Sequence, residues 1–371
     1  MGSNCLILGA GAVGKAVAGY IFSQMGCRIV FSDILPAVID DLNARMGYRV
    51  YENETDYTEV RSVDAFLISC TQRMSDEVTR ADYIVTSVGP EGFARLIRLI
   101  GSVLCQSANT GKPVVFFFFE NIRNSAAIAG ECLSGFEIGR PFSLVPVSID
   151  RISSGYCRGG AFDVIAESFI PVCVPADGIK DGLFSRFPQF IHLVDNLDAY
   201  YYRKLFTANM GHAVLAYAGS LYKCTTIIEA LEVPEVRNIL RGALEESSYA
   251  LVREYGFTEG EMDAFVVSLL EKRYPNRGLN DPLERLARDP IRKLGRNDRL
   301  TGAALLCLKH GLEPRSIIQA MTYAMRYEHP ADKSSLDLAA LLRKKGKACV
   351  LRKICGLQEN ELLYNLLMEQ G

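Results

Sequence analysis

Three polar side chains share one segment of helical pattern in the second half of the chain: Lys204, Asn209 and His212. At roughly 100° per residue they fall at about 0°, 140° and 80° around a helix, on one side of it. A lysine whose amine is desolvated has its pKa lowered toward neutrality and can serve as a general base. The asparagine can donate a hydrogen bond to developing oxyanion charge, and the histidine can hold a hydroxyl. The alternative is a partly exposed lysine beside an amide and a histidine that backbone groups satisfy.

A glycine-rich turn near the start of the chain reads Gly9-Ala10-Gly11-Ala12-Val13-Gly14, between an apolar run and an Ala/Val-rich amphipathic stretch. In this spacing Gly9 permits a tight turn, Gly11 lets the backbone approach a pyrophosphate, and Gly14 lets the helix pack close to the strand. The pyrophosphate then lies on the free N–H groups where the helix starts, around Ala12 and Val13. The pattern predicts a dinucleotide-binding β-α-β unit.

Asp33 ends the second strand of this unit, 24 residues after Gly9. A carboxylate at this point can bind both hydroxyls of the adenosine ribose and repel a 2′-phosphate. The position therefore favours NAD over NADP as the cofactor. A plain turn followed by a surface aspartate is the alternative.

Four further apolar runs continue the alternation of strands and helices, at residues 64–69, 81–88, 113–119 and 142–149. Runs that are apolar on both faces are typical of central strands in a parallel sheet covered by helices, so we expect the four phenylalanines at 116–119 in the core. In open α/β sheets the carboxyl ends of the strands line the ligand crevice. We therefore expect ligand-binding residues where the last three runs end, at Gly89, Glu120, Asn121, Asp150 and Arg151.

The second half of the chain changes to long amphipathic segments, starting near Asp195-Asn196. The sequence thus predicts an α/β amino-terminal Rossmann-type domain with a mostly parallel sheet at 1–195, and an all-α carboxy-terminal domain at 196–371 that carries the substrate and catalytic residues. Helices are expected at 198–219, 236–255, 259–272, 302–310, 314–327, 336–345 and 359–369.

Composition excludes several classes of protein. Among 371 residues, 41 basic side chains nearly cancel 43 acidic ones, so no strong field for nucleic acid or an anionic membrane is expected. No segment approaches the ~18 apolar residues of a membrane span. The 11 cysteines are scattered without a C-x-x-C pair, which argues against a disulfide framework or a zinc cluster and for a reducing cytoplasm. We expect a cytoplasmic protein, a monomer or small homo-oligomer, that binds small molecules and needs no metal.

Residues 203–212 resemble the signature K-x-x-x-x-N-x-x-H of the polyol-specific long-chain dehydrogenase/reductase family. Other stretches resemble its mannitol-1-phosphate 5-dehydrogenase branch, and the resemblance covers essentially the whole chain. These stretches are GAGAVGK at 9–15, ADYIVTSVGP at 81–90, ENIRNS at 120–125, IDRI at 149–152 and DPIRKLGRNDRL at 289–300.

The resemblance implies an NAD-dependent, metal-independent oxidoreductase that interconverts mannitol 1-phosphate and fructose 6-phosphate. It makes Lys204 the general acid/base, with Asn121 and Asn209 donating hydrogen bonds to the reacting oxygen. His212 would orient the adjacent hydroxyls of the substrate. Asp150 would fix the substrate or the network around the lysine. Gly89 and Glu120 would join the glycine-rich turn and Asp33 at the cofactor.

The chain departs from this branch on the substrate side. Tyr202 stands two residues before the lysine where the branch is often acidic, IDRI is followed by Ser153-Ser154 rather than a proline, and residues 155–180 keep little of the usual pattern. These departures leave open the same chemistry on an unphosphorylated polyol or an onate/uronate pair. They also leave open an NAD-binding protein without turnover.

A phosphorylated substrate would need cationic partners. Arg151 and Arg203 adjoin expected site residues, and we expect both to bind substrate; Arg296 and Arg299 are also available. For any one of these four arginines, a surface salt bridge is the alternative.

Overall fold

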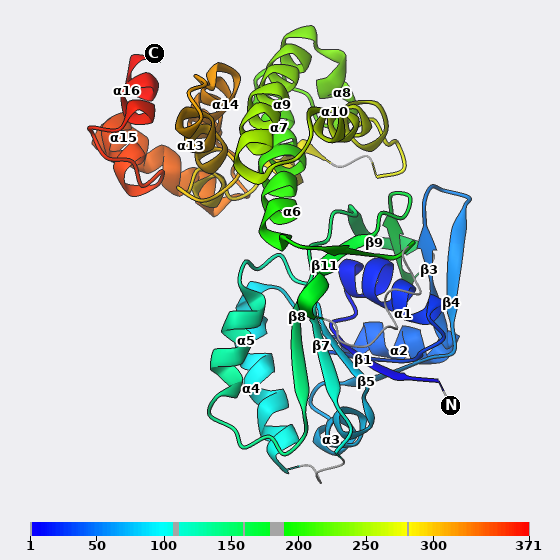
Figure 1. Ribbon diagram of the computed structural model, residues 1–371. Coiled ribbons are helices and arrows are strands. Elements are labelled where there is room, and N and C mark those ends of the chain that lie inside the picture. The colour runs from blue at the N-terminus through cyan, green and yellow to red at the C-terminus, as the bar shows by residue number, and fades with distance from the viewer. Residues whose placement is uncertain (1, 107–110, 159, 179–188, 280–281, 371) are drawn as a thin grey trace. The chain divides into compact units, whose positions relative to one another are not determined.

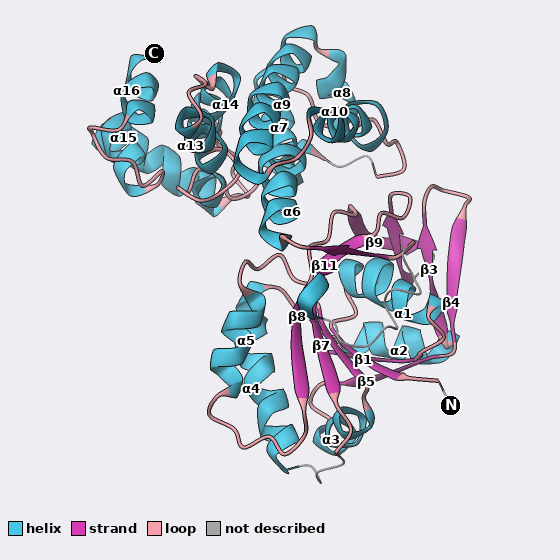
Figure 2. Ribbon diagram, in the orientation of Figure 1, coloured by secondary structure: helices cyan, strands magenta, loops and turns pink. Residues whose placement is uncertain are grey.

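The structure, a computed structural model, describes residues 2–106, 111–158, 160–178, 189–279 and 282–370 (Figure 1). Two compact units make up the chain, Met1–Tyr200 and Tyr201–Gly371. The division falls within helix α6 (Leu197–Lys204), slightly later than the boundary at 195 that the sequence suggests. Figure 2 shows that the first unit mixes strands with helices and that the second is built from helices.

A six-stranded sheet with the order β5-β2-β1-β6-β7-β8 forms the centre of the first unit. Every neighbouring pair in it is parallel. The strands are β1 (Asn4–Leu8), β2 (Arg28–Asp33), β5 (Val63–Leu67), β6 (Tyr83–Thr86), β7 (Val114–Phe118) and β8 (Phe142–Pro146). The expected parallel α/β domain is confirmed, and all six strands lie where apolar runs predict them, because residues buried on both faces leave no polar alternation in the sequence.

Helices cover both faces of this sheet. The helix after the glycine-rich turn and α2 pack on one face, and α3, α4 and α5 pack on the other. The first helix contains a π-helical segment, η1 (Gly14–Gly19), that continues into α1 (Tyr20–Gln24). The others are α2 (Pro36–Arg45), α3 (Thr71–Arg80), α4 (Pro90–Gln106) and α5 (Ser125–Leu133), with a short 3₁₀ turn at Ala176–Gly178.

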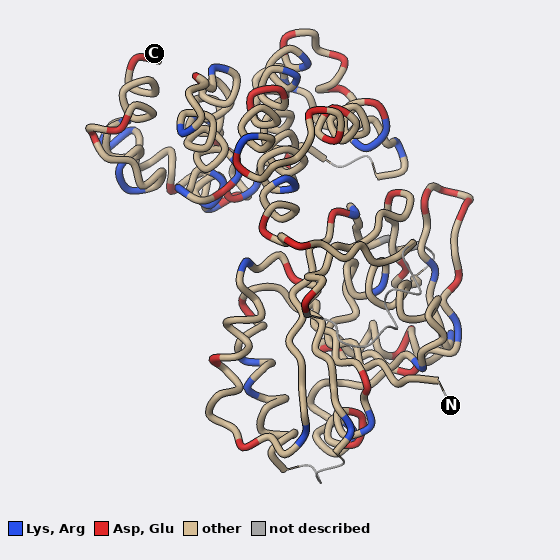
Figure 3. Tube along the Cα trace, in the orientation of Figure 1, with Lys and Arg blue, Asp and Glu red and all other residues tan. Residues whose placement is uncertain are grey.

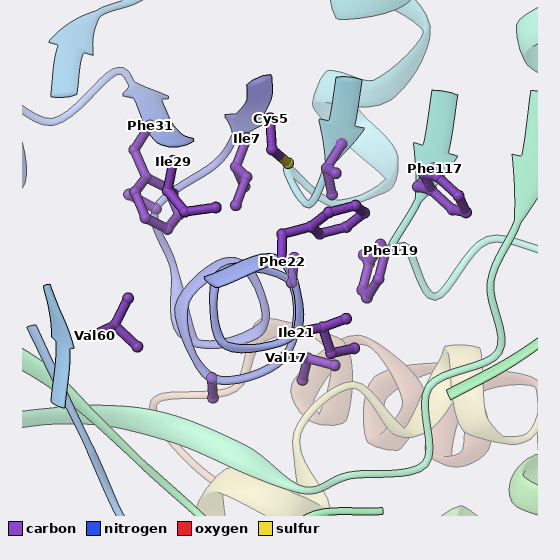
Figure 4. Packing of buried hydrophobic residues seen from close by; sticks show 14 of the residues in the cluster. Cys5, Ile7, Val17, Ile21, Phe22, Ile29, Phe31, Val60, Phe117 and Phe119 are labelled. Atoms are coloured by element: carbon purple, nitrogen blue, oxygen red, sulfur yellow. The ribbon is translucent and has the colours of Figure 1, made fainter. Parts of the chain in front are cut away.

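The four phenylalanines of β7 and its end alternate between the two faces. Phe117 and Phe119 belong to the core beneath the first helix, and Phe116 and Phe118 to the core on the opposite face. Phe22 of the first helix approaches Phe117 and Phe119 edge-on, with ring centroids 5.6 and 6.5 Å apart (Figure 4). These side chains therefore form core, as expected, and do not line a ligand site.

A second sheet in the first unit was not predicted from the sequence. It has the order β4-β3-β10-β9, and β11 and β12 form a separate parallel pair. Its strands are short and several carry polar residues, as in YTEVR of β4, so that no apolar run marks them. The bounds are β3 (Gly47–Tyr51), β4 (Tyr57–Arg61), β9 (Ser153–Arg158), β10 (Ala161–Ala166), β11 (Val172–Pro175) and β12 (Ile191–Val194). Of the divergent segment at 155–180, residues 159, 179 and 180 lie outside the described residues.

The described part of the second unit is helical, apart from an isolated bridge between Thr226 and Pro282. This confirms the expected all-α domain. After α6 come η4 (Leu205–Asn209), α7 (Met210–Leu221), α8 (Ile227–Glu232), α9 (Pro234–Tyr255), α10 (Glu259–Ser268), η5 (Leu269–Arg273), α11 (Leu283–Ala287), α12 (Pro290–Lys293), α13 (Thr301–Lys309), α14 (Arg315–Arg326), α15 (Lys333–Lys353) and α16 (Leu362–Glu369). Helix α15 is interrupted at Gly346, whose φ of 75° is not helical.

In the described parts of both units, Lys and Arg residues are interspersed with Asp and Glu residues along the Cα trace (Figure 3). None of the described helices combines the length and the apolar character that crossing a membrane requires.

Candidate active site

The glycine-rich turn of the first unit depends on two glycines. Gly9 has a φ of 108°, and a Cβ atom there would lie 2.4 Å from the Ser87 carbonyl oxygen. A Cβ atom on Gly14 would lie 2.0 Å from the Gly9 carbonyl oxygen. Side chains at either position would therefore push the turn away from β6 and the helix away from the turn. The Ser87 hydroxyl closes the arrangement by donating to the Gly9 carbonyl at 3.1 Å.

The start of the helix offers an anion site. Gly11 is exposed, and a Cβ atom built on it meets no atom within 4 Å. The helix begins at Ala12, and the Lys15 N–H donates to the Gly11 carbonyl oxygen at 3.0 Å. The N–H groups of Ala12 and Val13 thus belong to the first turn, which has no intrahelical acceptors. An exposed backbone with such donors fits a pyrophosphate.

Asp33 lies beside this turn at the end of β2. One of its carboxylate oxygens accepts the Ala10 N–H at 2.7 Å, and the other accepts the Leu35 N–H at 3.0 Å. Each oxygen keeps a second lone pair for a hydroxyl donor. The carboxylate is therefore oriented next to the glycine turn, as recognition of a ribose requires, and its charge opposes a phosphate at the same place.

Glu120 and Gly89, both expected at the cofactor, are in direct contact. The Glu120 carboxylate accepts the N–H groups of Val88 and Gly89, each at 2.9 Å. Only 7% of Glu120 is exposed, and burial raises the pKa of its carboxyl group. Gly89 has a φ of 80°, which a residue with a side chain adopts at a cost. Glu120 therefore fixes the backbone of the loop after β6 through these two hydrogen bonds.

Asn121 and Asp150 follow β7 and β8, which are adjacent parallel strands, so they lie at the same edge of the sheet. Asn121 is exposed and Asp150 is partly exposed. This is the edge at which the glycine turn after β1 and the loop after β6 also lie, since all of these strands are parallel. The carboxyl-end location that the sequence predicts for them is thus observed.

Arg151 is placed differently from its neighbour. Only 5% of it is exposed, and its guanidinium donates to the carbonyl oxygens of Ala16 at 2.6 Å and Glu167 at 2.8 Å. It also stacks on the rings of Tyr20 and Phe169, 5.5 and 5.1 Å from their centroids. Arg151 therefore ties the first helix to the segment after β10, and this geometry gives it a structural task in place of the expected substrate contact.

Lys15 performs a similar task, which sequence reasoning missed. Its ammonium donates to the Phe162 carbonyl oxygen of β10 at 2.6 Å, and burial lowers its pKa to about 8. Two buried cations in or near the cofactor motif thus connect the first helix to the second sheet. The lysine in GAGAVGK was the available signal, but it could be interpreted only once the second sheet was known.

In the second unit, Lys204, Asn209 and His212 lie on one continuous helix made of α6, η4 and α7. The π-helical segment η4 occupies Leu205–Asn209, between the lysine and the asparagine. The π-helical turn holds one extra residue, which corresponds to about 100° of rotation around the helix axis. Relative to Lys204, Asn209 therefore lies at about 40° in place of about 140°, and His212 at about −20° in place of about 80°. The three residues therefore span about 60°, a narrower arc than the roughly 140° of a regular α-helix.

His212 is neutral in this environment. Burial, with positive charge nearby, lowers the pKa of its imidazole to about 3. The ring lies against Tyr274, with centroids 4.9 Å apart and an angle of 72° between the ring planes. A neutral imidazole has one acceptor nitrogen, which can accept a hydroxyl proton.

Three arginines of the second unit act on this histidine, since the charges of Arg273, Arg285 and Arg299 all lower its pKa. Arg299 also acts on Lys293, which is only 5% exposed and whose pKa is lowered to about 7, first by burial. The carboxylates of Asp289 and Asp298 oppose this effect and raise the pKa of Lys293. Buried positive charge is costly unless anions join it.

Arg203, Arg296 and Arg299, which the sequence offered as phosphate ligands, each have partners in the structure. Arg203 lies over the rings of Phe265 and Phe257, at 4.4 and 5.4 Å from their centroids. Arg296 forms an ion pair with Glu361 at 2.6 Å near the surface. Arg299 pairs with Asp298 at 2.8 Å, and only 14% of its side chain is exposed.

Solved structures with the same fold include three dehydrogenases or reductases. A Pseudomonas fluorescens mannitol 2-dehydrogenase, in a ternary complex with NAD and D-mannitol, has a TM-score of 0.74 and 15% identity, over 95% of this chain and 86% of its own. A D-sorbitol dehydrogenase in substrate-free form has a TM-score of 0.70 and 15% identity, over 93% and 94%. A 2-dehydropantoate 2-reductase from Geobacter metallireducens has a TM-score of 0.55 and 13% identity, over 87% and 99%. At such identities the likeness concerns the fold.

Two family matches go further. Residues 3–182 match the mannitol dehydrogenase Rossmann domain, and residues 196–368 match the mannitol dehydrogenase C-terminal domain. The first match confirms the expected dinucleotide-binding domain, to which the geometry of the glycine turn and Asp33 adds the preference for NAD. Together the two matches confirm the polyol dehydrogenase family that the sequence resembles: the chain belongs to the mannitol dehydrogenase family.

Proposed function

We propose that the protein is an NAD-dependent polyol-phosphate dehydrogenase, which interconverts mannitol 1-phosphate and fructose 6-phosphate without a metal. The observation that carries the proposal is the narrow arc of Lys204, Asn209 and His212 on one helix, in a chain of the mannitol dehydrogenase family. The unphosphorylated polyol remains the second candidate, since the mannitol 2-dehydrogenase of the same fold was solved with D-mannitol.

The residues of the first unit fit NAD. The turn from Gly9 to Gly14 would hold the pyrophosphate, Asp33 would hold the adenosine ribose, and Gly89, shaped by Glu120, would complete the loop beside them. When bound, NAD supplies the acceptor for the hydride that leaves the carbinol carbon. The Asp33 charge disfavours a 2′-phosphate and thereby selects against NADP.

The proposed catalytic step is a proton transfer to Lys204. Its neutral amine takes the proton of the reacting hydroxyl while hydride leaves the same carbon, and in the reverse direction its ammonium returns that proton. The amides of Asn209 and Asn121 donate hydrogen bonds to the oxygen as negative charge develops on it. His212 accepts the proton of a neighbouring hydroxyl, which its neutral ring allows. Asp150 orients the substrate or the lysine.

Phosphate recognition is assigned to the cations near His212. Arg299 and Lys293 are the best supported, because both are mostly buried and their charges act on each other. A phosphate dianion would offset the cost of holding these charges together. Arg151 donates to backbone carbonyls and Arg203 stacks on aromatic rings, so we give both the supporting role of fixing nearby backbone and side chains.

The test is a panel of NADH oxidation rates with fructose 6-phosphate, fructose, fructuronate and tagaturonate. We expect the highest kcat/KM with fructose 6-phosphate, and loss of turnover in Lys204→Ala with NADH binding retained. Lys309→Ala, which removes an exposed lysine paired with Glu254, is the matched control and should keep full activity. Faster turnover of an unphosphorylated ketose would overturn the phosphate assignment. Unchanged turnover in Lys204→Ala would overturn the mechanism, and NADH binding without turnover of any sugar would favour the non-catalytic alternative.

A further inference from the structure

The π-helical turn at Leu205–Asn209 is held by hydroxyl groups from outside its own helix. Such turns are rare, because they give up regular ladder geometry, and they occur mostly as single turns at functional sites. The Ser247 hydroxyl of α9 donates to the Phe206 carbonyl. The Tyr274 hydroxyl, from the residue after η5, donates to the Ala208 carbonyl at 3.1 Å. Both carbonyls belong to the π-helical turn, so its shape depends on these partners.

Tyr274 is packed closely against the helix that contains the π-helical turn, and only 2% of it is exposed. Its hydroxyl occupies the space beside Gly211, because a Cβ atom on that glycine would lie 2.1 Å from the hydroxyl oxygen. Only glycine at 211 admits the tyrosine hydroxyl to the helix backbone. The sequence separation of 66 residues between Tyr274 and Ala208 explains why no local pattern could reveal the contact.

Tyr274 also contacts His212. The two rings meet at an angle of 72° with centroids 4.9 Å apart. The tyrosine thus bonds to the backbone carbonyl of Ala208, four residues before the histidine, and packs against the histidine ring itself.

We propose that Tyr274 is a positioning residue for the reaction, which holds the π-helical turn that gathers Lys204 and Asn209 and fixes the orientation of the His212 ring packed against it. The effect on turnover rests on the proposed function, whereas the effect on the histidine ring does not. Tyr274 itself touches the backbone of the turn and the ring of His212, and it acts through them.

The test compares Tyr274→Phe with Tyr217→Phe. Tyr217 is an equally good control for a lost hydroxyl, since it is 1% exposed and its hydroxyl donates to the Ala287 carbonyl at 2.9 Å, away from the π-helical turn. Ring nitrogens are observed by NMR in protein labelled with ¹⁵N-histidine, which contains four histidines. His212→Asn identifies the signal of His212.

We expect the ring signal of His212 to shift in Tyr274→Phe, because the turn that precedes the histidine loses the hydroxyl that holds it. The signal should stay unchanged in Tyr217→Phe. In the same variants, kcat should fall about tenfold in Tyr274→Phe only, with the Kd for NADH unchanged, as loss of an orienting hydrogen bond predicts.

Equal effects of the two tyrosine variants, or an unchanged His212 signal in Tyr274→Phe, would overturn the proposal. If Tyr274→Phe does not fold, Gly211→Ala makes the same test, because a Cβ atom there would lie 2.1 Å from the Tyr274 hydroxyl oxygen and should displace it. An unchanged His212 signal in Gly211→Ala would equally overturn the proposal. If the wild type turns over none of the sugars, the proposed function fails while the NMR comparison still decides the relationship between Tyr274 and His212.

Discussion

The carboxylate of Glu120 accepts the backbone N–H of Gly89 at 2.9 Å, and with its other oxygen it accepts that of Val88. Both donors belong to the loop after β6, on the edge of the sheet where the glycine turn lies. Replacing one oxygen by an amide NH₂ group sets a donor against a donor. The loop must then move or lose a hydrogen bond in a buried place.

We therefore predict that Glu120→Gln weakens NADH binding about tenfold, which corresponds to ~1.4 kcal/mol. The Kd is measured by the fluorescence of bound NADH. Glu246→Gln is the matched control, because Glu246 also accepts two backbone N–H groups, from Ser316 at 2.8 Å and Ile317 at 3.1 Å, but in the second unit. An equal loss in both variants would indicate general destabilisation and contradict a role at the cofactor loop.

The charge of Asp33 leads to a second prediction. Asp33→Asn keeps an acceptor for only one of the two N–H groups that the carboxylate binds, those of Ala10 and Leu35, and removes the negative charge beside the glycine turn. We expect the ratio of kcat/KM for NADH to that for NADPH to fall about tenfold or more, since repulsion of the 2′-phosphate is lost. Asp41→Asn, which removes a carboxylate paired with Arg45 on α2, should leave the ratio unchanged. A constant ratio in Asp33→Asn would mean that this carboxylate does not face the ribose.

The six strands of the main sheet and the location of Asn121 and Asp150 at its carboxyl edge could be predicted, because burial on both faces leaves long apolar runs in the sequence. The role of Arg151 could not. An arginine just past a strand resembles an exposed ligand, and its burial depends on the second sheet, whose short and partly polar strands carry no clear pattern.

The helix that carries Lys204, Asn209 and His212 was also only partly predictable. Its presence at 198–219 was predictable from periodicity, but the π-helical turn within it was not. A regular helix would spread Lys204, Asn209 and His212 over about 140°, whereas the extra residue brings them within about 60°. That turn is supported by Ser247 and Tyr274, which are distant in sequence, so a calculation from local spacing alone underestimates how well the three residues converge.

The buried cations of the second unit give a prediction about substrate selection. Lys293→Met should raise the KM for fructose 6-phosphate about tenfold and leave the KM for an unphosphorylated ketose unchanged, because only the phosphate would contact this charge. Initial rates at saturating NADH measure both constants. Lys309→Met, at an exposed ion pair with Glu254, is the control and should change neither. Parallel increases for both sugars would place Lys293 outside any phosphate subsite.

The neutral state of His212 predicts how stability depends on pH. Its folded-state pKa is about 3, whereas an unfolded histidine has a pKa of about 6.5. Between these values the unfolded chain binds a proton that the folded protein does not, so the free energy of unfolding falls as the pH drops from about 6.5 toward 3. Above about 6.5 both states are unprotonated and the contribution is complete.

His212→Asn lacks this proton linkage. When the pH falls from 8 to 5, the free energy of unfolding of the wild type should therefore drop by about 2 kcal/mol more than that of His212→Asn. Urea titrations followed by circular dichroism at the two pH values measure it. His192→Asn, at an exposed histidine of the first unit, provides the comparison, and its difference from wild type should change far less. If the difference for His212→Asn were the same at both pH values, the imidazole would be accepting a proton in the folded protein, and the neutral acceptor that the proposed mechanism needs would be absent.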